Sequence, residues 1–185
     1  RLNSPNDLAI RKNGDIYFTD PIYGLPQRAK DPMREIDFCG VYRLEKDGTV
    51  TLQYKDMSRP NGIGFSPDHN LLYVANSDGG DPVWRAFPVK EDGNLGDPEV
   101  FFDSSKDDRV PRSGGDGLKV DTKGNVFATG AGGVLILSPK GELLGRLVTG
   151  ESIANVAWGN DGSTLYLTSD MYLCRIQTKT EGAGF

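Results

Sequence analysis

The chain has 185 residues, 37% of them hydrophobic, and its 26 acidic and 21 basic side chains give a formal net charge of −5. This length fits one domain with a buried core, and the negative charge disfavours a nucleic-acid-binding surface. No apolar run approaches the roughly 20 residues that a membrane-spanning helix requires. We therefore expect a soluble protein with neither nucleic acid nor membrane as a partner, and the sequence leaves cytoplasm and periplasm open.

Short runs of β-type sequence recur along the chain, and helical periodicity is nearly absent. Turn sequences rich in Gly, Asn, Asp and Pro separate the runs, which favours antiparallel hairpins. The predicted strands are Leu8–Ile10, Asp15–Thr19, Gly40–Leu44, Thr49–Tyr54, Gly62–Phe65, Leu71–Ala75, Val83–Pro88, Val100–Asp103, Gly117–Val120, Val126–Thr129, Gly133–Leu137, Leu143–Val148, Val156–Trp158, Leu165–Ser169 and Tyr172–Ile176.

The same pattern begins at Asn6, Asn61, Asp116 and Asn155, which are separated by 55, 55 and 39 residues. Residues 116–150 contain four predicted strands, and four antiparallel strands per repeat are typical of a β-propeller blade. An immunoglobulin-like sandwich is the weaker interpretation, because it does not explain the repeat. We predict an all-β propeller with blades at roughly 6–58, 61–104, 116–150 and 155–185.

The predicted last blade shows only about two clear strands, and the chain begins at Arg1 without a Met. Propellers usually close by joining strands from both chain ends. We therefore expect about four C-terminal blades of a larger ring, with about two further blades upstream and six in the complete protein.

An insertion from Pro21 to Phe38 interrupts the first repeat between its second and third strands. It fits a solvated loop and a lid over the axial channel equally well. Elsewhere, Trp84 and Trp158 are expected in the core, Cys39 and Cys174 as buried free thiols, and residues 130–133 in a hairpin. The one histidine, His69, is expected in an exposed turn, which leaves no base for a Ser-His-Asp triad.

Equivalent positions of a radial array point at one axis, so we expect Asn6, Asn61 and Asp116 to converge there. Each alone has a simpler interpretation, because Asn and Asp are favoured in turns for local reasons. Three in register favour a metal site, and Asn155 is a weaker fourth candidate. Oxygen donors select a hard cation, so Ca²⁺ is favoured, with Zn²⁺, Mg²⁺ and Mn²⁺ as alternatives.

Several segments in order resemble the gluconolactonase/regucalcin family, the senescence-marker-protein-like lactonases. They are residues 3–7 (Asn-Ser-Pro-Asn-Asp), 17–24, 59–63 and 115–117, and the resemblance spans essentially the whole chain. It implies that Asn61 and Asp116 bind the metal directly. It also implies that Asn6 sits at the same ion, as a ligand or as a donor to substrate, and that Tyr23 approaches the substrate.

The resemblance also marks two departures. A glutamate ligand of the family's first blade has no counterpart in this chain. Ser4 stands where some members carry an arginine that is used on sugar-acid substrates.

These observations together predict a metal-dependent hydrolase that opens a small-molecule sugar lactone. The ion would polarise the lactone carbonyl, and Asp116 would hold the ion and act as general base on the attacking water. Two alternatives stay open. One is an ester or phosphotriester hydrolase of the paraoxonase or fluorophosphatase kind, and the other is a non-catalytic, metal-stabilised binding module. The oligomeric state stays open as well.

Overall fold

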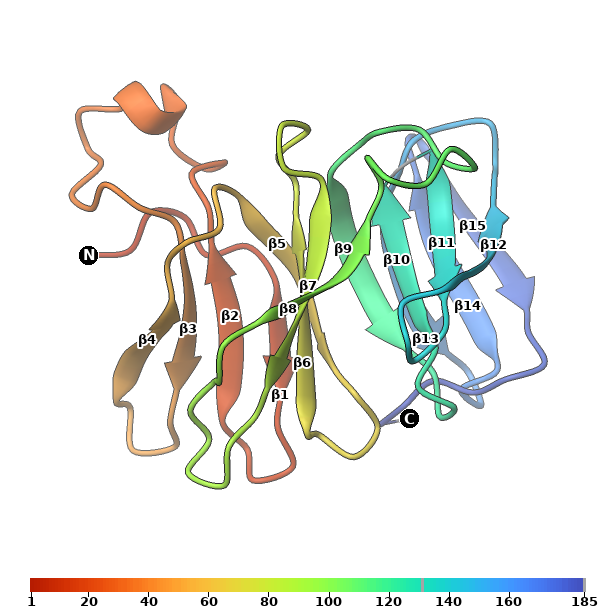
Figure 1. Ribbon diagram of the computed structural model, residues 1–185, viewed down its shortest axis with the longest axis horizontal. Coiled ribbons are helices and arrows are strands. Elements are labelled where there is room, and N and C mark those ends of the chain that lie inside the picture. Colours follow the sequence, from red (N-terminus) through yellow and green to blue (C-terminus); the bar gives the residue numbers. More distant parts are fainter. Residues whose placement is uncertain (131, 185) are drawn as a thin grey trace.

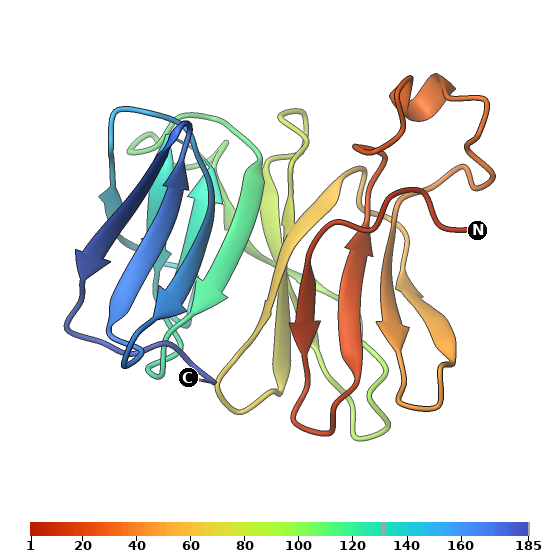
Figure 2. The same cartoon turned by 180° about the vertical axis from the view of Figure 1, so that it is seen from behind.

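The computed structural model describes residues 1–130 and 132–184, which form fifteen β-strands and one short 3₁₀ turn, η1 (Arg28–Lys30). The strands make four antiparallel sheets that follow one another along the chain (Figures 1 and 2). The first sheet contains β1 (Leu8–Ile10), β2 (Ile16–Asp20), β3 (Gly40–Leu44) and β4 (Val50–Tyr54). The second contains β5 (Pro60–Phe65), β6 (Leu71–Asn76), β7 (Val83–Pro88) and β8 (Glu99–Asp103).

The third sheet contains β9 (Gly115–Val120), β10 (Val126–Gly130), β11 (Gly133–Leu137) and β12 (Leu143–Leu147). The fourth contains β13 (Ile153–Gly159), β14 (Thr164–Ser169) and β15 (Tyr172–Gln177). Within each sheet, sequential strands pair in chain order. The last sheet has three strands, at the three predicted segments, although only about two of these were counted as clear. The third, β15, is largely exposed and shows little apolar alternation.

The first strands of the sheets lie side by side on the inner side of the array: β1 contacts β5, β5 contacts β9, and β9 contacts β13 (Figure 2). Antiparallel sheets arranged radially in this way are the blades of a β-propeller, so the predicted all-β propeller fold is confirmed. Two glycines allow this close approach. A Cβ atom at Gly62 would come within 2.1 Å of the Asp116 carbonyl oxygen, and one at Gly117 within 2.0 Å of Asn155 Oδ1.

The apolar core lies between neighbouring sheets in three clusters. Tyr17 and Met57 belong to the cluster between the first two sheets, and Trp84 to the cluster between the second and third. Trp158 belongs to the cluster between the third and fourth. Both tryptophans are therefore core residues, as the sequence predicts. Such clusters make each sheet depend on its neighbour for burial of its apolar surface.

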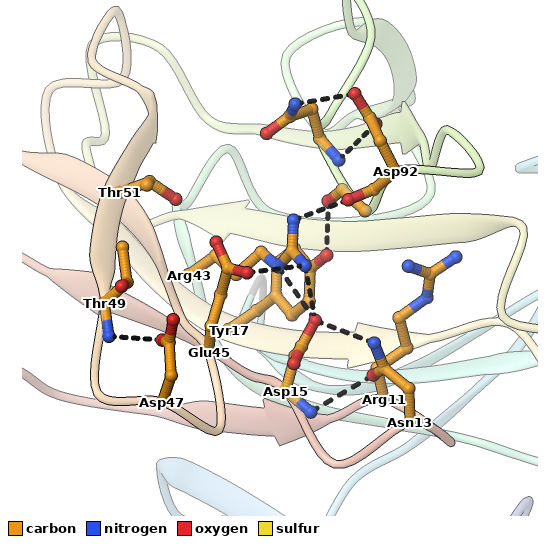
Figure 3. Close-up of polar contacts among 12 residues, drawn as sticks. Arg11, Asn13, Asp15, Tyr17, Arg43, Glu45, Asp47, Thr49, Thr51 and Asp92 are labelled. Carbon is orange, nitrogen blue, oxygen red and sulfur yellow. Dashed lines mark hydrogen bonds and ion pairs between the residues drawn. The ribbon is translucent and has the colours of Figure 1, made fainter.

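A buried ion pair within the first sheet lies next to the second sheet (Figure 3). Arg43 Nη2 lies 2.7 Å from Asp15 Oδ2, and both side chains are less than a tenth exposed. The same guanidinium donates to the backbone carbonyl of Asp92, at 2.7 Å, and the Tyr17 hydroxyl donates to the carbonyl of Gly93. Arg43 therefore holds the turn at residues 92–93 of the second sheet against the first.

Several smaller expectations have clear outcomes. Cys39 and Cys174 are both free thiols, although Cys174 is half-buried and not buried. Gly130 pairs with Gly133 where β10 meets β11, as expected for a hairpin, while Ala131 lies outside the described residues, as does Phe185 at the end of the predicted last blade. No helix in the described ranges is long and apolar enough to cross a membrane.

Candidate functional site

One cavity of about 510 Å³ is lined by Asn6, Tyr23, Asn61 and Asp116, all of which the sequence singles out. It lies where the inner strands begin: Asn6 precedes β1, and Asn61 and Asp116 are each the second residue of their strands. The latter two were expected just before their strands. The rest of its lining consists of Ser77, Ser113, Gly114, Gly115, Gly130, Gly132, Gly133, Ser152 and Ile153.

Asn61 is fixed on the second sheet and reaches the third. Its side chain is buried, and its Nδ2 donates to Ser77 Oγ at 2.8 Å. Ser77 Oγ in turn donates to the Gly115 carbonyl at 2.5 Å, next to Asp116. The Asn61 side chain is also close enough to Asp116 to influence its pKa. Because the amide nitrogen of Asn61 donates to protein, its carbonyl oxygen is the atom suited to a ligand.

Asp116 is the carboxylate of the cavity, and its pKa is shifted by its surroundings. Burial raises the pKa of Asp116 above its ordinary value, the negative charge of Asp7 raises it further, and the Asn61 side chain opposes the shift. A carboxylate with a raised pKa in a cavity is unfavourably charged until a cation or proton arrives.

Asp7 does not line the cavity, but its charge acts on Asp116, and the sequence reasoning missed it. Its Oδ1 accepts from the Leu8 N–H at 2.8 Å, but its Oδ2 is buried and has no hydrogen-bond partner among the described residues. Comparison of the repeats concealed it, because the equivalent positions are Gly62 and Gly117. A charged side chain where other repeats carry glycine was the available signal.

A network around Thr19 and Asp20 positions Asn6. The Asn6 N–H donates to the Thr19 carbonyl at 2.9 Å, and Thr19 Oγ1 donates to the Asn61 carbonyl at 2.8 Å. The preceding residues are held by the fully buried carboxylate of Asp20, which accepts from the N–H groups of Asn3 and Ser4 at 2.8 and 2.7 Å. The chain before β1 is therefore tied to the end of β2.

Tyr23 reaches the cavity because the insertion is anchored at its start. Ser4 Oγ donates to the Pro21 carbonyl at 2.5 Å and accepts from the Gly24 N–H at 2.9 Å. The Arg28 guanidinium lies over the Tyr23 ring, 5.2 Å from its centroid, and donates to the Tyr23 carbonyl. This part of the insertion therefore borders the cavity, whereas residues around η1 are exposed (Figure 1).

Comparison with known proteins identifies the family to which the chain belongs. A family profile described as "SMP-30/Gluconolactonase/LRE-like region" matches residues 1–171. The chain belongs to this family. It is 37% identical to a gluconolactonase from Zymomonas mobilis over 98% of this chain and 52% of that protein.

Solved structures of family members share the fold. A gluconolactonase from Xanthomonas campestris superimposes with a TM-score of 0.83 at 32% identity, covering 96% of this chain and 58% of that one. The calcium-binding protein regucalcin from Agrobacterium tumefaciens gives 0.73 at 23% identity, covering 98% and 62%. The chain thus spans about half the length of the curated relative and about three fifths of these solved chains.

Asn155, the weaker fourth candidate, does not line the cavity. Asn155 Oδ1 accepts from the Val156 N–H at 2.8 Å, and its side chain lies against Gly117. A register shift in β13 between Ile153 and Asn155 accompanies this placement, and Ser152 and Ile153 line the cavity instead. His69 lies in a turn as expected, but it is half-buried and not exposed. Its positive φ of 61° accompanies stacking of its ring on Phe65.

The donor set suits a hard divalent cation. It comprises the amide oxygens of Asn6 and Asn61 and the carboxylate of Asp116, and the negative charge of Asp7 acts on Asp116. Within residues 1–130 and 132–184, no group of three or more His, Cys, Asp or Glu side chains could hold a metal, so such a site depends on amide oxygens. Ca²⁺ accepts neutral amide oxygens readily.

Proposed function

We propose that the protein hydrolyses sugar lactones with the help of a divalent cation, Ca²⁺ being the favoured ion. The observation that carries this proposal is the meeting of Asn6, Asn61 and Asp116 in one polar cavity. Membership of the gluconolactonase family supports the reaction class. The cation would be held by Asn61 and Asp116, with Asn6 at the same ion.

A cation bound there would supply electrophilic polarisation of the lactone carbonyl. Asp116 takes the proton from the attacking water, so that a C–O bond forms at the carbonyl carbon. The ring C–O bond then breaks, and the proton passes to the departing ring oxygen to give a hydroxy acid, which releases its carboxyl proton to solvent. Asn6 orients the substrate from the first blade, and Tyr23 bounds the space above it.

The lining of the cavity favours a polyhydroxylated substrate. Apart from Ile153 and the ring of Tyr23, the side chains that line it among the described residues are amides, hydroxyls and a carboxylate. Hydroxyl groups of a sugar ring find hydrogen-bond partners there, whereas an aryl ester or a phosphotriester would leave those groups unpaired. This polarity favours a sugar lactone over the substrates of the alternative hydrolases.

A substrate panel tests the proposal. The purified protein is assayed with Ca²⁺ on glucono-1,5-lactone, an unsubstituted six-membered lactone, phenyl acetate and a phosphotriester. We expect the highest kcat/KM on the sugar lactone. A preference for the phosphotriester or aryl ester would replace the proposed substrate class, and inactivity on all four would favour a binding module.

A further inference from the structure

A second cavity lies at the opposite end of the inner strands, far from the proposed lactone site. It has a volume of about 430 Å³ and is bordered by Ile10, Phe65, Val120 and Trp158, which lie at or near the ends of the strands whose beginnings form the first cavity. Residues 183–184 also border it, close to the C-terminal label in Figures 1 and 2. We refer to it as the basal cavity.

The basal cavity is electropositive. Arg11, Lys12 and Lys119 line it, and among the described residues its lining contains no Asp or Glu. Each of the three donates to a backbone carbonyl: Arg11 Nη2 to Lys90, Lys12 Nζ to Pro67 and Lys119 Nζ to Leu118, at 3.3, 3.2 and 2.9 Å. In the parts of the chain that the structure describes, none of the three forms an ion pair with a carboxylate. Three cations without a salt-bridged carboxylate in a protein of net charge −5 are a local exception.

The nearby carboxylates are engaged elsewhere. Asp15 pairs with Arg43 at 2.7 Å (Figure 3), although the charge of Arg11 also helps to lower the pKa of Asp15. Asp68 accepts hydrogen bonds from Ser66 Oγ at 2.6 Å and from the Asn70 backbone and side chain. Neither lines the basal cavity. The cations at this end are therefore left facing solvent or a ligand.

His69 adds an unused polar atom to the same wall. Its ring stacks on Phe65 with centroids 4.9 Å apart, and its Nδ1 is buried without a hydrogen-bond partner among the described residues. Buried polar atoms in folded proteins nearly always have hydrogen-bond partners. We therefore expect His69 Nδ1 to bond a ligand or an ordered water.

We propose that the basal cavity binds a small oxyanion, a phosphate or carboxylate group carried by a metabolite. A concave site lined by one sign of charge concentrates counter-ions. The guanidinium of Arg11 matches the paired oxygens of either group, and Lys12 and Lys119 act as point charges. Phe65 and Trp158 form the apolar wall against which the carbon skeleton of the metabolite packs.

Trp158 supplies an internal reporter. It lines the basal cavity, whereas Trp84, the other tryptophan of the chain, is fully buried in another cluster. In a Trp84→Phe background, inorganic phosphate and gluconate are titrated separately while Trp158 fluorescence is recorded, and calorimetry measures the same affinities. We expect saturable binding of at least one probe, weakening as ionic strength rises because salt screens the attraction.

Charge variants assign the binding to this cavity. Lys119→Gln and Lys12→Gln are each expected to weaken it at least about tenfold, because each removes one cationic contact. Lys140→Gln is the matched control, an exposed turn lysine outside the cavity, and should bind as the parent does. If Lys119→Gln does not fold, the anion affinity of Lys12→Gln, a variant of an exposed turn residue, tests the proposal alone.

The two probes separate the sources of the anion, since saturation by phosphate alone identifies a phosphorylated ligand and saturation by gluconate alone a carboxylate. Failure of both probes to saturate, or equal affinity in the parent and Lys12→Gln, overturns the proposal. The lactone site is untouched by these variants, so its own test stands separately.

Discussion

Asp7 and Asp116 lie close enough for the negative charge of Asp7 to raise the pKa of Asp116, in addition to the larger effect of burial. Asp7 Oδ2 is itself buried and unpartnered among the described residues. Two carboxylates in this relation repel each other until a cation or a proton compensates them. This repulsion supports the proposal that a cation binds at this end of the inner strands.

Replacing Asp7 by Asn tests this relation. The variant loses one negative charge beside the proposed cation site, so we expect Ca²⁺ affinity to fall at least about tenfold. Affinity falls in acid wherever a proton competes for Asp116, and without Asp7 the midpoint of that fall should move to lower pH. Calorimetric titration with Ca²⁺ across a pH series measures both effects. Asp161→Asn, an exposed turn carboxylate, serves as the control, and an unchanged midpoint in Asp7→Asn would contradict the electrostatic link.

Asp116→Asn should abolish most lactonase activity and weaken cation binding together. Asn has nearly the same size, so the fold should survive, as circular dichroism can verify. What disappears is the charge that attracts the cation and the group proposed as general base. Initial rates on glucono-1,5-lactone at rising Ca²⁺ give the measurement. Activity close to that of the parent protein at saturating Ca²⁺ would remove Asp116 from the mechanism.

Asn61→Ala should behave differently, because it removes a neutral ligand and leaves the base in place. We expect weaker Ca²⁺ binding and partial recovery of activity when Ca²⁺ is raised. The lost bond to Ser77, 2.8 Å long in the parent, also reduces stability modestly. Ser77→Ala is the matched control, because it breaks the same hydrogen bond but keeps the amide oxygen. Equal Ca²⁺ affinity in the two variants would argue against Asn61 as a ligand.

Arg43→Met should destabilise the fold by about 3 kcal/mol, because it leaves the buried carboxylate of Asp15 without its partner. Urea unfolding of the parent and the variant gives the difference. The double variant Asp15→Asn/Arg43→Met should recover part of the loss, since no buried charge then remains. A loss in the double variant equal to that in Arg43→Met would show that packing, and not the ion pair, carries the effect.

The same pair predicts a pH dependence. Burial opposes ionisation of Asp15, yet hydrogen bonds from Asn13 and Arg43 and the charge of Arg43 hold the pKa of Asp15 below its ordinary value. A lowered pKa stabilises the fold above the unfolded-state value, near 3.9, and this contribution is lost as pH falls through the folded-state value. The stability gap between the parent and Arg43→Met should therefore narrow in acid. A constant gap across that range would contradict the assignment.

The sequence was most informative where local chemistry repeats. Turn residues and alternating apolar runs predicted the strand order, and the shared register of Asn6, Asn61 and Asp116 predicted a cavity that contains all three. Asn155 occupies the same sequence register, but the register shift in β13 is a property of strand pairing that the repeat pattern does not contain.

The features that sequence reasoning missed depend on three-dimensional environment. Asp7 is significant because its Oδ2 is buried and its charge acts on Asp116. The dipeptide Asn6-Asp7 in the sequence does not indicate that this oxygen is buried. The packing of His69 on Phe65 depends on a left-handed backbone at a position where the turn sequence suggested only exposure. The number of blades in the complete ring stays a prediction.

The most direct test of the central claim compares Ca²⁺ binding and lactone hydrolysis in one preparation of the purified protein. A chelator removes the cation, and Ca²⁺ is then restored in steps while calorimetry and the initial rate on glucono-1,5-lactone are recorded. We predict that activity disappears with the chelator and returns along the binding curve, and that both curves shift together in Asn61→Ala. Undiminished hydrolysis in the chelated protein would contradict the account.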